Sequence, residues 1–308
     1  MILCCGDALI DMIPTATRAG PDGFVPHNGG AVYNTAIALG RLGVQTGMLT
    51  GLSRDMFGQH LLDGLKASHV DVSHVILSDR PTTLAFVRLL DGHASYDFYD
   101  ENSAGRMLTP EAMPTLSRGV TALFFGGISL ACEPGADAYA ALLTRSAGGR
   151  AVMLDPNIRP GFIRDIDRYR QRLDRMIALS DIVKVSDEDL HWITPGALSL
   201  RKKVDRLLAK GPSLVILTRG GEGATGVLAS GGEVQVSARK AVIADTVGAG
   251  DTFNAGVLAK LSDLGQLHKA GLAALSPETL RETLAHGARV AAITVSRAGA
   301  NPPWASEL

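Results

Sequence analysis

Short apolar runs recur along the 308-residue chain, and segments with helical periodicity lie between most of them. The runs are rich in branched side chains, which favour buried strands. They cover Ile2–Cys5, Thr46–Leu49, Val120–Phe125, Ala151–Leu154, Asp181–Val185 and Leu214–Leu217. Strands that alternate with helices are typical of a parallel sheet covered on both faces. The pattern therefore predicts an α/β fold with a doubly wound, mostly parallel sheet.

Two stretches show the clearest helical pattern, and a third region favours a hairpin. In Ala31–Leu42, apolar side chains recur near one face, and Gly43 follows at a position that suits the residue after a helix. A second long helical stretch is Leu280–Val295. Residues 225–228 and 234–237 flank a Ser-Gly-Gly sequence, so we expect them to pair as antiparallel strands.

Two segments do not fit the alternation of strands and helices. Residues 12–28 hold prolines and glycines ahead of the first helix, and residues 82–99 alternate as strands around an Asp91-Gly92 turn. We interpret residues 12–28 and 82–104 as a small, discontinuous β lid. The lid and the main sheet would belong to one domain that spans residues 1–308.

Composition excludes several classes of protein and partner. The chain is 46% hydrophobic, which is enough for a large buried core. Its 30 basic and 31 acidic residues give a net charge of -1, so no overall field attracts nucleic acid or acidic membranes. Cys4, Cys5 and Cys132 match no zinc or redox spacing, and no run is long enough for a membrane span. We expect a cytoplasmic protein without nucleic-acid or membrane partners.

The most informative segment is Asp245-Thr246-Val247-Gly248-Ala249-Gly250-Asp251, in which small residues and then a carboxylate open a helix. Small residues allow close backbone approach, and free N–H groups at a helix start favour anions. An acid beside such an anion hole can accept the proton of an attacking hydroxyl. The segment therefore predicts phosphoryl transfer without a P-loop. The alternative is a capped helix start whose dipole favours Asp251.

Polar residues follow several of the predicted strands, where ligands bind in open α/β sheets. Asp7 and Asp11 follow the first strand and are able to accept hydrogen bonds from a polyhydroxy ligand, although taken alone they fit better as a turn cap at Asp7 and a solvated acid at Asp11. Gly29-Gly30 precedes a helix that presents Asn34 one turn later, or it forms an ordinary tight turn. These residues are candidates for binding a sugar.

Two further loops suit phosphate or nucleotide. Asp155-Pro156-Asn157 and Arg159 form a rigid segment with an amide and a guanidinium, which favours phosphate or sugar. Residues 218–223, Thr-Arg-Gly-Gly-Glu-Gly, follow another strand and are able to pass the backbone around a nucleotide. Each loop alone also fits an ordinary turn. The histidines include no His-Glu-x-x-His and no close pair, which argues against a transition-metal site built by the protein.

In their order along the chain, these segments resemble the ribokinase-like sugar kinases, the carbohydrate kinase family of phosphofructokinase B type. The matching segments are Gly29-Gly30 through Gly43, Asp155-Pro156-Asn157, Lys184 through Asp189, Thr218 through Gly223, and Asp245 through Gly256. The resemblance spans nearly the whole chain. It implies a ribokinase-like fold and ATP-dependent phosphorylation of a sugar hydroxyl, with magnesium bridging the phosphate oxygens.

The resemblance also implies roles for individual residues. Asp251 would be the general base, and the N–H groups of Gly248, Ala249 and Gly250 would stabilise the transferring phosphoryl group. The sugar would be bound by Asp11, Gly29, Gly30, Asn34, Phe98, Arg159 and Asp251. The nucleotide would be bound by Lys184, Ser186, Thr218, Gly220, Gly223, Gly248, Gly250 and His286.

The sequence departs from the family pattern at two places. Ser186 and Asp189 stand where the family usually has Asn-x-x-Glu, so a water-mediated magnesium contact would fall to Asp189 or Glu188. His286 stands where the late helix often carries Asn near the adenine. Family members often bind a monovalent cation, such as potassium, through backbone oxygens. In this chain, the backbone oxygens that would bind such a cation belong to Asp245, Val247, Ser296 and Gly299.

The lid segment indicates the sugar. Residues 96–106 resemble the segment that covers the sugar in bacterial fructokinases, and 2-keto-3-deoxygluconate kinases have a related one. The acidic Asp97, Asp100 and Glu101 outnumber Arg106, which favours a neutral sugar. We therefore expect conversion of fructose to fructose 6-phosphate. Ribokinase fits less well, because residues 31–33 differ from its usual signature, and a nucleoside kinase remains an alternative.

Two other classes of protein are compatible with parts of the pattern. A sugar-binding regulatory protein that has lost catalysis would have no need of Asp251. A nicotinamide-dependent oxidoreductase would need a spaced glycine triplet after its first strand, and the chain has none. Lid strands expose edges that pair readily between subunits, so we expect a homodimer.

Overall fold

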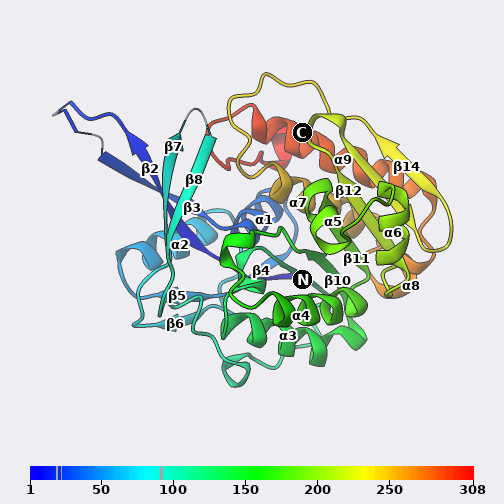
Figure 1. The fold of residues 1–308 in the computed structure, drawn as a ribbon, viewed down its shortest axis with the longest axis horizontal. Coiled ribbons are helices and arrows are strands. Elements are labelled where there is room, and N and C mark those ends of the chain that lie inside the picture. The colour runs from blue at the N-terminus through cyan, green and yellow to red at the C-terminus, as the bar shows by residue number, and fades with distance from the viewer. Residues whose placement is uncertain (19, 22, 91–92) are drawn as a thin grey trace.

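An eight-stranded sheet forms the centre of the protein (Figure 1). The computed structural model describes residues 1–18, 20–21, 23–90 and 93–308. The strand order is β14-β13-β12-β11-β10-β9-β1-β4. The bounds are β1 Ile2–Cys5, β4 Thr46–Leu49, β9 Ala122–Gly126, β10 Ala151–Asp155, β11 Ile182–Ser186, β12 Leu214–Thr218, β13 Ala224–Leu228 and β14 Glu233–Val236. Within this sheet, the six neighbouring strands β4, β1, β9, β10, β11 and β12 pair in parallel. This confirms the predicted mostly parallel sheet.

The carboxyl ends of four strands extend one residue beyond the predicted apolar runs, and the first of them, β9, ends at Gly126. β10, β11 and β12 end at Asp155, Ser186 and Thr218, because backbone pairing continues after the apolar side chains stop. β13 pairs antiparallel with both β12 and β14, so the predicted hairpin is confirmed. The central sheet therefore presents polar side chains along one edge.

Helices cover both faces of the central sheet, as the alternation predicts. On one face lie α1 Ala31–Arg41, α2 Met56–Ala67, α7 Ala249–Asp263, α8 Lys269–Ala273 and α9 Pro277–Val295. On the other face lie α3 Gly135–Ser146, α4 Ile166–Leu179, α5 Asp187–Ile193 and α6 Leu200–Leu208. Short 3₁₀ turns occur at Pro110–Ala112, Ile128–Leu130, Ala147–Gly149, Pro160–Phe162, Gly220–Glu222 and Ala305–Glu307.

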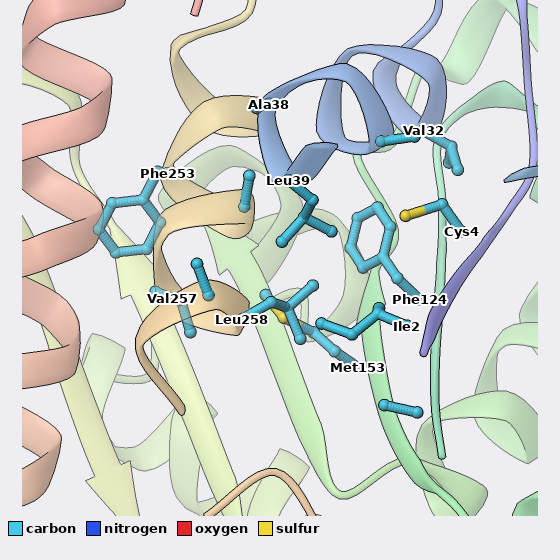
Figure 2. Close-up of a cluster of buried hydrophobic side chains, with 14 of the residues drawn as sticks. Ile2, Cys4, Val32, Ala38, Leu39, Phe124, Met153, Phe253, Val257 and Leu258 are labelled. Atoms are coloured by element: carbon cyan, nitrogen blue, oxygen red, sulfur yellow. The ribbon is translucent and has the colours of Figure 1, made fainter. Parts of the chain in front are cut away.

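The apolar side chains of each central strand separate into two buried clusters. Figure 2 shows the first, in which Leu39 of α1 and Leu258 of α7 pack near Phe124 and Met153 of the sheet. Val152 and Leu154 point into the second cluster, under α3 and α4. Alternate residues of β10 thus reach opposite faces, and Asp155 follows Met153 onto the face covered by α7. This places a carboxylate beneath the start of α7.

A separate four-stranded sheet holds the two segments predicted to form a lid, in the order β3-β2-β7-β8. Its strands are β2 Leu9–Thr15, β3 Gly23–Gly29, β7 Leu84–Leu90 and β8 His93–Tyr99. It projects from the main body (Figure 1). A short third sheet pairs β5 Gly51–Ser53 with β6 Ile76–Ser78. The predicted turn at Asp91-Gly92 lies outside the described residues.

The small sheet begins earlier than the sequence suggested. β2 starts at Leu9 rather than at residue 12, because Leu9 pairs with Gly29 and Ile10 with Leu84. Asp11 is therefore part of a strand of the small sheet and does not lie in a loop after β1. The sheet itself thus carries one of the predicted sugar-binding carboxylates.

The structure also shows the state of the cysteines and the character of the helices. Cys4, Cys5 and Cys132, which match no zinc or redox spacing, are free and buried. Within the described part of the chain, no helix combines the length and the apolar character that a membrane span requires.

Candidate active site

A cavity of about 390 Å³ lies between the small sheet and the start of α7. Its lining residues come from both sheets, from the loop after β10 and from the segment before α7. They are Asp7, Leu9, Asp11, Gly30, Ala31, Tyr96, Phe98, Gly127, Ile128, Asn157, Arg159, Lys184, Thr246, Val247, Gly248, Ala249, Gly250 and Asp251. The cavity has the size of a small-molecule site, and its lining mixes acids, cations and aromatic rings.

Asp251 is held in the first turn of α7 with its side chain almost fully buried at 8% exposure. Its Oδ2 accepts a hydrogen bond of 2.9 Å from Asn34 Nδ2. Its carbonyl oxygen accepts one of 3.2 Å from the Thr35 hydroxyl. Burial raises the pKa of Asp251 to about 7, and the charge of Asp155 adds to this, while Asn34 opposes it. A carboxylate with this pKa is suited to act as a general base near neutral pH.

The predicted anion hole forms the start of α7. Gly248 adopts a left-handed conformation with φ of 77°, and a Cβ at this position would lie 2.6 Å from the Ala300 methyl carbon. The first N–H groups of a helix have no acceptor within it, so those after Gly248 face outward. One of them is partly used, because the N–H of Ala249 donates to the Thr246 carbonyl at 3.3 Å. The arrangement is suited to an anion beside Asp251.

Two more carboxylates, Asp7 and Asp11, line the cavity. Oδ2 of Asp7 accepts a hydrogen bond of 2.9 Å from the N–H of Ala31, the first residue of α1. Burial raises the pKa of Asp7 to about 6, and burial together with the charge of Asp7 raises that of Asp11 to about 6. A Cβ on Gly29 would lie 2.1 Å from Asp11 Oδ2, so only glycine leaves room for this carboxylate. Both groups favour ligands that donate hydrogen bonds.

The opposite wall of the cavity is aromatic and basic. Phe98 packs edge-on against Phe162, with ring centroids 4.3 Å apart, and Tyr96 stacks beside it at 5.9 Å. Arg159 lines the same cavity. Tyr96 and Asn157 also line it. The sequence indicated the Asn157 amide as a candidate for binding phosphate or sugar, but it gave Tyr96 no role of its own. The alternation of β8 was the available signal for Tyr96, since residues 96 and 98 share a face.

Lys184 lies below the start of α7 with its ammonium group buried. Its Nζ is 3.0 Å from Asp155 Oδ2, and the same oxygen accepts a hydrogen bond of 2.7 Å from Asn254 Nδ2. Burial opposes the charge of Lys184, but the carboxylates of Asp155 and Asp189 outweigh it and raise the pKa of the ammonium. The group therefore stays positively charged beside the candidate anion hole.

Asp189 and Ser186 form the cap of α5 and lie outside the cavity. Ser186 Oγ accepts from the N–H of Asp189, and Asp189 Oδ2 accepts from the N–H of Ser186 at 3.1 Å. The other oxygen, Oδ1, accepts from the N–H of Ile158 at 2.8 Å. Asp189 therefore does not fit a direct ligand of a metal ion, and Glu188 is exposed beside it. Among the residues that the structure describes, no three His, Cys, Asp or Glu side chains form a metal cluster.

Among the predicted nucleotide residues, Lys184, Gly248 and Gly250 line the cavity, whereas the others do not. Thr218 is the register partner of Ser186 at the same edge of the central sheet. Gly220 and Gly223 follow it with positive φ values, and a Cβ on Gly223 would lie 2.1 Å from the Val236 carbonyl oxygen. His286 lies on α9, where burial and the charge of Lys260 lower its pKa.

The segments predicted to bind a monovalent cation meet in the fold. Asp245 Oδ2 accepts a hydrogen bond of 2.9 Å from the N–H of Gly299, and Oδ1 accepts one of 3.0 Å from the N–H of Val247. The N–H of Ala244 donates to the Val295 carbonyl, one residue before Ser296. The two loops are thus joined at the point where the resemblance places the cation.

Comparison with known proteins agrees with this arrangement. Residues 1–307 match the family described as pfkB family carbohydrate kinase. A fructokinase from Rhizobium leguminosarum bv. trifolii is 50% identical over 285 residues, which cover 91% of this chain and 86% of the relative.

Solved structures of fructokinases have the same fold. One from Xylella fastidiosa with bound ATP has a TM-score of 0.88 and 28% identity, covering 97% of this chain and 93% of that one. A double mutant from Vibrio cholerae O395, bound to fructose, ADP and potassium, has a TM-score of 0.84 and 25% identity with the same coverage. The family match spans nearly every residue, and the chain therefore belongs to the pfkB family of carbohydrate kinases.

Proposed function

We propose that this chain is an ATP-dependent fructokinase that transfers the γ-phosphoryl group to fructose and forms fructose 6-phosphate. The observation that carries the proposal is Asp251, a buried carboxylate with a pKa of about 7 that lies at the start of α7 beside the first N–H groups of that helix. The 50% identity to a fructokinase from Rhizobium supports fructose as the substrate.

The chemical step needs a base and a fixed site for negative charge. Asp251 takes the proton of a fructose hydroxyl, and the hydroxyl oxygen forms a bond to the γ-phosphorus. The bond between this phosphorus and the bridging oxygen breaks, and ADP leaves with that electron pair. The N–H groups of Gly248, Ala249 and Gly250 stabilise the charge on the transferring group.

The surroundings of Arg106 support a neutral sugar. Its guanidinium donates to Asp100 Oδ2 at 2.7 Å, and both side chains are largely buried. Asp97 is paired with Arg88, and Glu101 with Arg164. Arg106 is therefore already neutralised and does not offer a free cation to the carboxylate of 2-keto-3-deoxygluconate. Asp11, Asn157 and Tyr96 provide acceptors and donors for hydroxyl groups.

The nucleotide is proposed to be ATP, as in the Xylella fastidiosa structure. Its γ-phosphoryl group would lie at Gly248 to Gly250, and the rest along Ser186, Thr218, Gly220, Gly223 and His286. Because Asp189 is engaged by backbone N–H groups, we propose that magnesium enters on the phosphates and has no direct protein ligand. Potassium is proposed between residues 245–247 and 296–299, since the Vibrio cholerae protein was solved with potassium.

Three further expectations remain proposals. The small sheet would close over the sugar as a lid, and fructose would then slow hydrogen exchange of the amides in this sheet. Unchanged exchange would contradict closure.

The exposed edge strands β3 and β8 would allow a homodimer, which light scattering of the purified protein measures. A cytoplasmic location is also proposed, and cell fractionation tests it.

A substrate screen tests the proposed function. ADP release is measured with ATP and fructose, 2-keto-3-deoxygluconate, ribose or a nucleoside as the acceptor. We expect the highest kcat/KM with fructose. A higher value with another acceptor would reassign the substrate within the family. Fructose binding without ADP release from any acceptor would instead indicate an inactive sugar-binding protein.

A further inference from the structure

Lys184 places a buried positive charge against the backbone of the anion hole. Only 5% of this residue is exposed, yet it lines the same cavity as Asp251. A Cβ built on Gly250 would lie 3.4 Å from Lys184 Nζ, so the ammonium group contacts the first turn of α7. A phosphoryl group bound at these N–H groups would therefore lie within reach of the ammonium.

Two side chains fix the position of this ammonium group. Asp155 ends β10, which pairs in parallel with β11, and its Oδ2 lies 3.0 Å from Lys184 Nζ. Asn254, one turn after Gly250 on α7, donates to the same Oδ2 at 2.7 Å. The other oxygen of Asp155 accepts from the N–H of Asn157 at 3.2 Å. Lys184 thus has one defined partner and few alternative positions.

Stability alone does not account for this buried ion pair. Removing two charges from water costs free energy, and apolar side chains of similar volume are often neutral or more stabilising at such positions. The adjacent positions on the same face of the sheet, Met153, Ile182 and Ile216, are apolar and belong to one core cluster. The chain nevertheless keeps the Lys184–Asp155 ion pair here, and Lys184 lines the cavity.

We propose that Lys184 is a catalytic residue that binds the transferring phosphoryl group, and that Asp155 and Asn254 are positioning residues that hold its ammonium in place. This inference rests on the proposed kinase function. Lys184 neither gives nor takes a proton. It attracts the negative charge that the phosphoryl oxygens carry while the bond to the sugar forms and the bond to ADP breaks. In a water-excluded site this attraction is stronger than in solution.

The geometry also explains why a lysine side chain, and not a metal ion held by Asp189, supplies the positive charge beside the phosphoryl group. Both oxygens of Asp189 are engaged by backbone N–H groups, so this residue holds no metal ion directly against the phosphoryl group. Lys184 is the register neighbour of Ile216 on β12 and sits in the middle of β11, so its backbone is fixed by strands on both sides. The ammonium is therefore preorganised before the nucleotide binds.

The test compares Lys184→Met with Lys203→Met. Lys203 is a matched control, since it is also buried, at 1% exposure, but its Nζ contacts His191 on the far side of the sheet. We expect Lys184→Met to lower kcat about 100- to 1,000-fold, as loss of one transition-state donor does, and Lys203→Met to leave kcat nearly unchanged. A kcat for Lys184→Met within about 3-fold of a fructose-active wild type would overturn the proposal, since that is far below the loss expected for one such donor.

A binding experiment makes the test independent of turnover. Calorimetry with fructose present measures the affinity for ADP alone and for ADP with aluminium fluoride and magnesium, which imitates the transferring phosphoryl group. Lys184→Met should bind ADP normally and lose the extra affinity for the fluoride complex, whereas equal losses for both ligands would contradict the proposal. Asp155→Asn, which keeps the shape of the side chain, should show the same selective loss if Lys184→Met does not fold.

The failures of the two proposals are distinguishable. If the wild-type protein phosphorylates no acceptor, the proposed function fails, whatever Lys184 does. If the wild type phosphorylates fructose and the fluoride complex binds Lys184→Met as tightly as wild type, only the role of Lys184 fails.

Discussion

Asn34 Nδ2 donates a hydrogen bond of 2.9 Å to Asp251 Oδ2, although the two residues are 217 positions apart in the chain. Asn34 belongs to α1, which follows the small sheet, and Asp251 to α7, which covers the central sheet. A second contact joins the same two helices, since the Thr35 hydroxyl donates to the Asp251 carbonyl. The proposed base is therefore oriented by the helix that begins next to the residues proposed to bind the sugar.

The first prediction concerns this hydrogen bond. Asn34→Ala removes the donor that favours the charged form of Asp251, so the pKa of Asp251 should rise above its present value of about 7. The midpoint of kcat/KM against pH should move upward in the variant. An unchanged midpoint would show that Asn34 does not act on the base, and circular dichroism checks that the variant is folded.

The second prediction concerns the base itself. Asp251→Asn keeps the shape of the side chain but cannot accept the hydroxyl proton. We expect kcat to fall by on the order of 100- to 10,000-fold, while the affinity for fructose changes little, because the base acts mainly in the transition state. Calorimetric titration with fructose and a turnover assay measure the two effects. Wild-type turnover in this variant would remove Asp251 from its role.

The third prediction concerns pH. As pH rises, kcat/KM should increase, whereas the contribution of Asp11 to the free energy of unfolding should decrease. The kcat/KM of the wild type should rise with pH through a midpoint near 7, since Asp251 acts as the deprotonated form.

Burial raises the pKa of Asp11 to about 6 in the folded protein, so folding favours its protonated form. The pKa of this carboxyl in the unfolded chain is about 4. The contribution to stability is therefore fully present below about pH 4 and is lost as pH rises through about 6.

Asp11→Asn isolates that effect. The variant keeps a neutral side chain at every pH, so at pH 7 its free energy of unfolding should exceed that of wild type by up to about 3 kcal/mol. The difference between the two proteins should shrink toward pH 4. Its KM for fructose should rise, because a carboxylate acceptor is lost. Denaturant unfolding measures the first effect, and a variant less stable than wild type at pH 7 would contradict it.

The fourth prediction concerns the left-handed Gly248. Gly248→Ala places a methyl group 2.6 Å from the Ala300 methyl carbon and strains a φ of 77°. We expect a loss of about 1–3 kcal/mol in stability and a fall in kcat, because the N–H groups of the anion hole shift. Gly148→Ala is the matched control, since no atom lies within 4 Å of the added carbon. Equal effects in the two variants would contradict a special role for Gly248.

Much of the fold could be predicted from the pattern of apolar residues. The runs at Ile2–Cys5 and Thr46–Leu49 coincide with β1 and β4, because strands buried on both faces have apolar side chains from end to end. The strand ends were less visible. Asp155, Ser186 and Thr218 continue the ladders with polar side chains, and only backbone pairing reveals this.

The candidate site could be predicted as residue types, but its internal contacts could not. The glycines at 248 and 250, Asp251 and Asp11 were identified from local sequence and line one cavity. The hydrogen bonds from Asn34 to Asp251 and from Asn254 to Asp155 join distant parts of the chain, so no local pattern contains them. The hydrogen bond from the N–H of Ile158 to Asp189 Oδ1 likewise joins α5 to a different loop.

Transfer of phosphate to fructose is the central claim, and phosphorus NMR of the reaction products tests it most directly. Wild-type protein with ATP, magnesium and fructose should give ADP and an equal amount of a phosphate monoester on the 6-oxygen of fructose. Asp251→Asn under the same conditions should give neither product at a comparable rate. Absence of the fructose ester from the wild-type reaction, or its equal formation by the variant, would contradict the account.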